Sequence, residues 1–325
     1  MGKRDAVDKR ASGLMLILCA IWGLQQVAMK AAAPDIAPIL QVAFRSGAAS
    51  VMVGLLMLAR GERLSLSDGT WRPGILVGLL FALEFLFVGE GLRYTSASHM
   101  VIFLYTAPIF AALLLQWKLP AERLLRGQWI GIGIAFAGIV TAFTGRLPAP
   151  IGSGATPWLG DLLGLAAGMA WGTTTLVIRS SCLATASATR ILLYQLVGAF
   201  VLLMLAACLL DQTAFRLTRL VWSSLIFQVV LVSFASFLVW FWLLRHYLAS
   251  RLGVLSFMTP LFGITFGVWL LKEPLEPHFV SGALLVLTGI LLVSGYEGVK
   301  RMVRPQRPLD ESLPTSALTK EGRVN

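Results

Sequence analysis

Arg45 and Glu84 are the charged residues of this sequence best placed for chemistry, because each lies well inside a long apolar stretch. A charge inside a membrane span is costly, and such residues mark substrate paths, proton relays or paired contacts. At 1.5 Å of rise per helical residue, Arg45 lies about 10 Å and Glu84 about 13 Å from the same membrane face. We expect the two side chains to meet. Two interpretations stay open, a substrate-recognising or proton-responsive pair and a structural ion pair that joins two helices.

The composition places these residues in a membrane protein. Of the 325 residues, 57% are hydrophobic and 13% are charged, and the mean hydropathy is +0.79. A soluble domain has about 25% charged residues, and a disordered chain combines low hydrophobicity with high charge. Three cysteines are too few for a disulfide framework in a chain of this length. The class that remains is a polytopic membrane protein.

Ten apolar stretches are long enough to cross a bilayer as helices, which takes about 20 residues each. They are apolar on all sides and do not alternate, which favours helices over an outer-membrane barrel. The predicted fold class is therefore an all-α membrane protein with ten transmembrane helices. The predicted spans are residues 14–33, 38–58, 74–93, 97–117, 128–146, 158–178, 190–210, 222–246, 250–271 and 278–297.

The formal net charge of +11 indicates orientation. With both termini in the cytoplasm, most of the 27 Lys and Arg residues fall on the cytoplasmic side or in the C-terminal tail, as the positive-inside rule requires. We therefore predict cytoplasmic termini in a bacterial inner membrane, with lipid and no nucleic acid as partners. The first stretch is longer than the apolar core of a cleaved signal peptide, which is about 7–15 residues.

An internal repeat divides the chain into two halves. Three patterns recur at nearly one offset: Trp22-Gly23 at Trp171-Gly172, Ala97-Ser98 at Ala249-Ser250, and Glu122 at Glu273. Five helices per copy would invert the second copy relative to the first, as in many secondary transporters. The predicted parts are a cytoplasmic N-terminal tail (1–13), a first five-helix repeat (14–146), a linker (147–157), a second repeat (158–297) and a basic cytoplasmic tail (298–325).

Further candidates for a pathway are polar or aromatic residues within the predicted spans. The matched tryptophans could line a pathway or pack at the interface between the repeats, and the others offer donors and acceptors. Each could instead only bind a neighbouring helix, which is worth about 1 kcal/mol. These candidates are Trp22, Gln26, Tyr105, Trp171, Thr175, Tyr194 and Gln195.

Four residues are candidates for gating or for helix bending. Lys30 and Arg179 occupy matched positions near opposite membrane faces. They are either gating cations or side chains that reach out of the helix ends into water. Pro108 and Pro260 lie inside the fourth and ninth stretches. Each removes a helical hydrogen bond and is expected to bend its helix beside a central cavity.

Two shorter-range patterns predict local contacts. Glu84 and Glu90 are the only acidic residues that we place well inside the spans, and Glu90 is expected to pair with Arg93 at i+3. Glycines at four-residue spacing form a smooth ridge on one helix face, which favours close packing and could also serve as a sliding surface. The ridge consists of Gly160, Gly164, Gly168 and Gly172.

Motifs for cofactors are missing from the sequence. It contains no GxxxxGK[ST], HExxH or GxSxG pattern, and its three histidines and three cysteines are scattered. We therefore expect no nucleotide hydrolysis, no metal, no other cofactor and no catalytic residues.

Several motifs together resemble the EamA-type branch of the drug/metabolite transporter superfamily over residues 12–298. They are Ala20-Ile21-Trp22-Gly23, Ala170-Trp171-Gly172, Phe44-Arg45, Tyr94 to Ser98, Tyr105 to Pro108, Glu122-Arg123-Leu124, Thr259-Pro260 and Lys272 to Leu275. The resemblance implies a ten-helix carrier that exports amino acids or related metabolites across a bacterial inner membrane. It does not identify the substrate, because a fold does not determine function.

The leading functional hypothesis is a secondary carrier that exports a small metabolite by alternating access. Proton coupling through Glu84, uniport and exchange are all compatible with the residues, and the oligomeric state is open. The alternatives are an intramembrane enzyme, a membrane sensor and a channel. An enzyme needs a catalytic constellation at one depth, and a sensor needs a sizeable soluble domain. The sequence shows neither.

Overall fold

The computed structural model describes residues 9–62, 69–118, 124–144, 156–247, 252 and 255–303. These residues are almost entirely helical, and an isolated β-bridge joins Ile36 to Phe215. The prediction of an all-α protein is confirmed for this part of the chain. Most of both predicted tails and of the linker lies outside the described residues.

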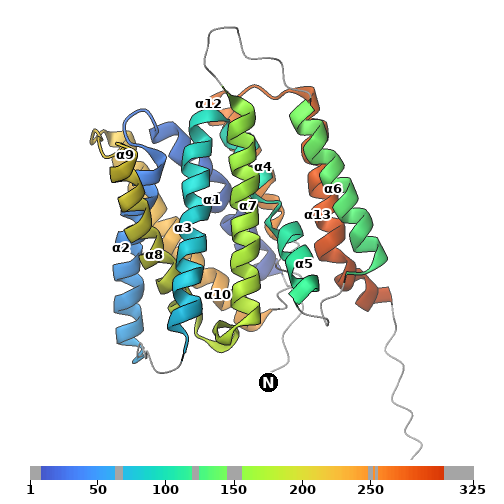
Figure 1. The fold of residues 1–325 in the computed structure, drawn as a ribbon, viewed down its shortest axis with the longest axis horizontal. Helices are drawn as coiled ribbons and strands as arrows, with labels where there is room; N and C mark the ends of the chain where they lie inside the picture. Colours follow the sequence, from blue (N-terminus) through green and yellow to red (C-terminus); the bar gives the residue numbers. More distant parts are fainter. Residues whose placement is uncertain are drawn as a thin grey trace, which may run out of the picture.

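The helices of the first half follow the predicted stretches closely. They are α1 (Lys9–Ala32), α2 (Pro38–Ala59), α3 (Trp71–Tyr94), α4 (Ala97–Leu104), α5 (Ala107–Lys118) and α6 (Arg126–Thr144). The second half contains α7 (Pro157–Ser180), the 3₁₀-helix η2 (Cys182–Thr185), α8 (Ala188–Leu209), α9 (Arg219–Ile226), the π-helix η3 (Phe227–Ala235), α10 (Ser236–His246), α12 (Met258–Leu271) and α13 (Pro277–Val303). Figure 1 shows these helices running side by side as one bundle.

Eight of the ten predicted spans are helical segments long and apolar enough to cross a membrane. They are Lys9–Ala32, Pro38–Ala59, Trp71–Tyr94, Ala97–Lys118, Arg126–Phe143, Pro157–Ser180, Ala188–Leu209 and Arg219–Trp240. The last two predicted spans correspond to shorter apolar helices, Met258–Leu271 and Pro277–Val293. Within the described residues the chain therefore has eight candidate spans and two shorter apolar helices. The count of ten spans stays a prediction.

The fourth span is broken and is not one continuous helix. The chain turns at Tyr105 and Thr106, between α4 and α5. Pro108 accounts for the break, because its ring would clash with the carbonyl of Leu104, four residues earlier. The Thr106 hydroxyl donates to the Phe103 carbonyl at 2.6 Å and so satisfies a helix-end acceptor.

Pro260 lies, like Pro108, just after an interruption of the helix, since Leu255 and Ser256 are helical and Phe257 is a turn. It lies in the first turn of α12, whose described helix begins at Met258. A proline in the first turn needs no amide donor, so it favours the start of a helix.

The eighth span contains a π-helical segment that the apolar pattern does not show. Residues Phe227–Ala235 form η3 between α9 and α10. Its buried Gln228 donates from Nε2 to Gln41 Oε1 of α2 at 3.0 Å and to Ser224 Oγ at 2.9 Å. Wider helical turns of this type commonly lie at functional positions.

Close helix contacts depend on glycines. The predicted ridge of α7 packs against the broken fourth span: Gly164 faces Phe103, Gly168 faces Thr106, and Gly172 faces Phe110 and Ala111. The close-packing interpretation of the ridge is confirmed. Gly131 and Gly138 of α6 approach the backbone of α13 in the same way, and these two helices lie together at one end of the bundle in Figure 1.

We predict that Gly168→Ala lowers the thermal stability of the purified protein. The added Cβ would lie 2.7 Å from Thr106 Oγ1 and 2.9 Å from the Phe103 carbonyl oxygen, and such overpacking costs about 1–3 kcal/mol. Thermal unfolding in detergent measures the effect. Gly133→Ala is the matched control, because a Cβ there meets nothing within 4 Å. Equal melting temperatures for the two variants would contradict the packing that we describe.

Candidate functional site

Arg45 of α2 is a buried cation with unused hydrogen-bond donors. Only 3% of its surface is exposed, and its Nε and Nη1 have no hydrogen-bond partner. Its guanidinium lies over the ring of Phe85 from α3, 4.3 Å from the ring centroid. A buried donor without a partner costs about 1–3 kcal/mol. The local packing therefore leaves part of this guanidinium available to another group.

Glu84 of α3 is a counter-charge that acts on this guanidinium. It is 6% exposed and lies within electrostatic range of Arg45. No nitrogen of Arg45 lies within 4.0 Å of a Glu84 oxygen, so the two do not form a direct ion pair. The structure thus brings the two predicted residues near each other but leaves a gap between them. Arg45 and Glu84 are called the Arg45–Glu84 site below.

Tyr105 and Trp171 border the same interior region. Tyr105 lies at the break between α4 and α5 and within electrostatic range of Glu84. Its ring meets that of Trp171 of α7 edge-on, with 5.4 Å between centroids. Tyr105 directly follows α4, and its amide donates to the Val101 carbonyl at 3.1 Å.

Thr259 of α12 is a neighbour of this region that we did not single out as a site residue. It is fully buried, and its side chain lies beside those of Tyr105 and of Cys19 in α1. The signal that could have revealed it is a polar residue directly before a proline in an apolar stretch. Gln26 of α1 is also buried at 3% exposure, and its Oε1 has no partner.

Other predicted residues make contacts of their own. Trp22 donates from Nε1 to Ser236 Oγ of α10 at 2.9 Å and meets Trp240 edge-on. Thr175 bonds to the carbonyl of Trp171 in its own helix. Tyr194 shares a 3.2 Å hydrogen bond with Thr70 at the start of α3. Gln195 is half-buried in α8, and Arg179 is exposed at the end of α7.

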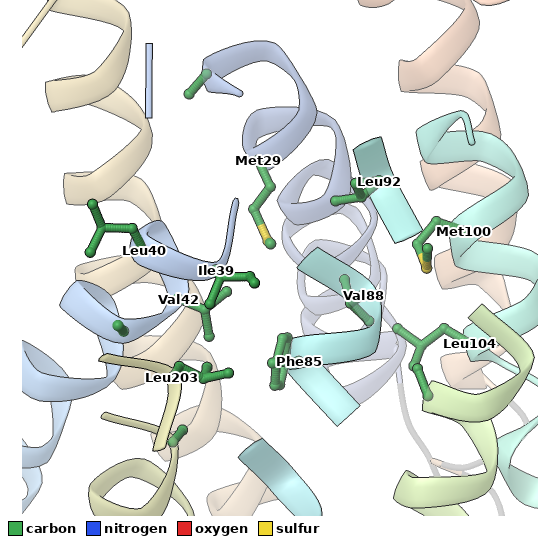
Figure 2. Close-up of a cluster of buried hydrophobic side chains, with 14 of the residues drawn as sticks. Met29, Ile39, Leu40, Val42, Phe85, Val88, Leu92, Met100, Leu104 and Leu203 are labelled. Atoms are coloured by element: carbon green, nitrogen blue, oxygen red, sulfur yellow. The ribbon is translucent and has the colours of Figure 1, made fainter. Parts of the chain in front are cut away.

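An apolar cluster lies between the Arg45–Glu84 site and the end of the bundle where α3 ends and α4 begins. Figure 2 shows Phe85, Val88 and Leu92 along α3, with Ile39 and Val42 of α2 on one side and Met100 and Leu104 of α4 on the other. Val88, Leu92, Ile39, Val42 and Met100 are fully buried. This cluster fills the interior between the site and that end.

Polar contacts join the helices at that same end, which we call the α3–α4 end. Lys30 of α1 donates to the carbonyls of Leu92 and Thr95. Glu273 accepts from the amides of Ala97 and Ser98 at 2.7 and 3.0 Å and from Ser98 Oγ at 2.6 Å. A carboxylate at a helix N-terminus satisfies free amides and suits the helix dipole.

Lys272 positions Glu273 for this contact. It ends α12 in the left-handed conformation, with φ of 56°. This conformation is uncommon for a residue other than glycine, and it turns the chain back toward α4. The α3–α4 end is therefore held closed by side chains from α1 and from the segment after α12. Of the two predicted gating cations, Lys30 makes contacts at this end, and its gating role stays a prediction.

A further acidic residue is buried, although it lies near the start of its span. We expected only Glu84 and Glu90 well inside the spans, but Asp161, in the second turn of α7, is fully buried. Its carboxylate binds Thr95 Oγ1 at 2.6 Å and His99 Nδ1 at 3.1 Å. The sequence did not reveal this burial, because Asp161 is close to the start of its helix. The burial results from packing of α7 against α3 and α4. The predicted pair of Glu90 and Arg93 is confirmed, at 2.9 Å.

The fold and its interior place this chain in the class of integral, multi-pass helical membrane proteins. The model of the EamA-like transporter family matches residues 9–144 and again residues 158–295. The chain therefore belongs to the EamA-like transporter family, as the sequence motifs predicted.

Similar proteins agree with this assignment. The uncharacterized transporter YvbV of Bacillus subtilis is 27% identical over 288 residues, which cover 88% of this chain and 92% of that protein. The uncharacterized transporter YoaV of the same organism is 26% identical over 274 residues, 84% of this chain and 92% of that protein. A WAT1-related chloroplast protein of Arabidopsis thaliana is 26% identical over 298 residues, 85% of this chain and 67% of that protein.

A solved crystal structure shares the fold. It aligns with a TM-score of 0.62 at 18% sequence identity, and the alignment covers 92% of this chain and all of the other.

We predict that the double variant Arg45→Met/Glu84→Met unfolds at a higher temperature than the wild type. It removes two buried charges that lack direct contact, and replacing such pairs by apolar residues stabilises proteins by about 1–4 kcal/mol. Each single variant leaves one uncompensated charge and should lower the stability. Thermal unfolding in detergent measures all three, with Arg93→Met as an exposed control expected to change stability by less than about 1 kcal/mol. A double variant less stable than both singles would show that the pair is a structural contact.

Proposed function

We propose that this protein is a secondary carrier that exports a small metabolite, such as an amino acid or a related compound, by alternating access. The observation that carries the proposal is the buried guanidinium of Arg45, whose Nε and Nη1 have no partner although Glu84 lies nearby. A structural ion pair would gain free energy by closing the gap. A substrate with an acceptor group gains the same free energy by binding there.

The chemistry of the site favours a substrate with an anionic or polar head and an apolar part. A guanidinium presents its donors in a planar fork that suits a carboxylate. Glu84 can accept from a donor on the same molecule, and the rings of Phe85, Tyr105 and Trp171 offer apolar and aromatic surface. Such a mixture is typical of sites for small molecules.

Alternating access is supported by the closed α3–α4 end. Between the site and this end lie the apolar cluster and then the contacts of Lys30 and Glu273. Transport requires this end to open, and the two five-helix repeats, 14–146 and 158–297, supply the symmetry for the exchange. We take the closed end as the outer face, since we propose cytoplasmic termini in a bacterial inner membrane. The first and last helices of the described chain begin and end on one side of the bundle (Figure 1).

We predict that Arg45→Ala and Glu84→Gln each reduce substrate counterflow in proteoliposomes by about 10- to 100-fold. A hydrogen bond to a charged group contributes about 1.5–3 kcal/mol, which corresponds to this range of affinity. The assay uses purified protein and a panel of labelled amino acids and related metabolites, and Arg45→Lys should retain partial counterflow.

Two controls accompany this measurement. Arg93→Ala and Glu90→Gln alter the exposed ion pair and should leave counterflow unchanged, and size-exclusion chromatography checks that every variant is folded. Counterflow at the wild-type level in both Arg45→Ala and Glu84→Gln would overturn the assignment of the site. Flux without saturation or counterflow would indicate a channel.

We predict that reporter proteins fused to the linker and to the C-terminus lie in opposite compartments. Green fluorescent protein fused after residue 325 should fluoresce, and alkaline phosphatase fused there should be inactive, because both behaviours are expected in the cytoplasm. Fusions at residue 150, after five predicted spans, should give the reverse. Equal behaviour at the two sites would contradict the proposed topology.

A further inference from the structure

His99 and Asp161 form a second group of buried titratable residues, separate from the Arg45–Glu84 site. Asp161 of α7 has a fully buried side chain, and 6% of the His99 side chain of α4 is exposed. His99 Nδ1 lies 3.1 Å from Asp161 Oδ2, while Thr95 Oγ1 donates to Asp161 Oδ1 at 2.6 Å. Both carboxylate oxygens therefore have partners, one of which is an imidazole that can change its charge.

The surroundings of this pair are apolar. The His99 ring stacks on Phe279 of α13, with 3.8 Å between centroids and 13° between planes, and Phe103 lies on another side at 6.2 Å. Backbone of the glycine ridge is also close, since Gly160 faces Thr95. A lone carboxylate in such a place is costly, and an adjacent cation offsets much of that cost. A proton on the imidazole supplies that cation.

We propose that the His99–Asp161 pair is a proton-binding site of this protein. The proton adds to an imidazole nitrogen, so that neutral histidine beside aspartate becomes an imidazolium–carboxylate pair with no net charge. Histidine is the side chain whose charge changes in the physiological pH range. That this proton is coupled to transport rests on the proposed carrier function, whereas the binding of the proton does not.

The His99–Asp161 pair connects two parts of the chain that must move relative to each other in the proposed transport cycle. Thr95 and His99 belong to the junction of α3 and α4 in the first proposed repeat, and Asp161 belongs to α7 in the second. Protonation gives the donor of this hydrogen bond a positive charge opposite the carboxylate, so that Coulomb attraction in the apolar interior strengthens the contact. The bound proton therefore holds α7 against this junction and favours the closed α3–α4 end.

Other charges at this end act on the pair in opposite directions. Lys30 bonds to the Thr95 carbonyl and opposes a second positive charge nearby, whereas Glu273 at Ala97 and Ser98 favours it. The ion pair of Glu90 and Arg93 is more exposed, on the outer part of α3. His278 at the start of α13 is exposed as well.

The direct test is nitrogen-15 NMR of protein labelled at histidine, in detergent micelles, titrated from about pH 5 to about pH 9. The chain has three histidines, so His99→Gln identifies the His99 signals by their loss, and His246→Gln and His278→Gln identify the exposed controls. We expect the His99 signals to titrate. In Asp161→Asn, which keeps the side-chain shape, the proton affinity of His99 should fall by about tenfold or more.

Two results would overturn the proton site. One is a His99 signal that keeps one protonation state over the whole pH range, and the other is the same titration midpoint in wild type and Asp161→Asn. The variants are first compared by size-exclusion chromatography. If Asp161→Asn does not fold, Thr95→Val replaces it, since it removes the second donor to the carboxylate, and we expect it to shift the His99 midpoint upward.

A flux measurement tests the coupling separately. In proteoliposomes, His99→Gln should retain counterflow at equal pH but lose the response of net flux to a pH gradient, with His278→Gln as the matched control. A full response in His99→Gln would remove the role in coupling. A wild-type protein without counterflow for any compound of the panel would remove the proposed function, while the NMR titration still decides the proton site.

Discussion

A charge in the apolar interior of a helix bundle has to be matched, because the surrounding side chains and lipid cannot solvate it. The described interior meets this constraint in two ways. Asp161 is fully matched by Thr95 and His99, whereas Arg45 keeps two donors without partners beside a carboxylate that it does not touch. The contacts of Asp161 join α7 to the junction of α3 and α4 without any ligand. The second arrangement is incomplete, and in the proposed function a ligand completes it.

The two groups occupy different levels of the bundle. The Arg45–Glu84 site lies among Phe85, Tyr105 and Trp171, and the His99–Asp161 pair lies close to the α3–α4 end. Apolar side chains of α2, α3 and α4 fill the interior on the way to that end (Figure 2). The broken fourth span contributes to both levels, since α4 carries His99 and the break after it carries Tyr105. A movement of α4 would therefore affect both groups together.

The sequence alone predicted much of this arrangement. Apolar stretches located the spans, because a bilayer demands length and hydrophobicity above all, and helical rise placed Arg45 and Glu84 at similar depth. It did not reveal that they stay apart, since that depends on how α2 and α3 rotate about their axes. The π-helix η3 was missed because a continuous apolar run has no polar-apolar periodicity from which the helix type could be predicted. Asp161 was missed because a residue near a helix start is buried only when other helices cover it.

The ridge of Gly160, Gly164, Gly168 and Gly172 has a consequence for the thermodynamics of helix separation. Glycine has no rotamers to restrict, so its burial carries no loss of side-chain entropy. When the helices separate, the α7 side therefore loses dispersion contacts between backbone surfaces and gains contacts with lipid. Few other terms of the free energy change on this side. An interface of this kind re-forms with the same geometry each time, since there is no repacking on one of its two faces. Its strength is set by the length of the ridge.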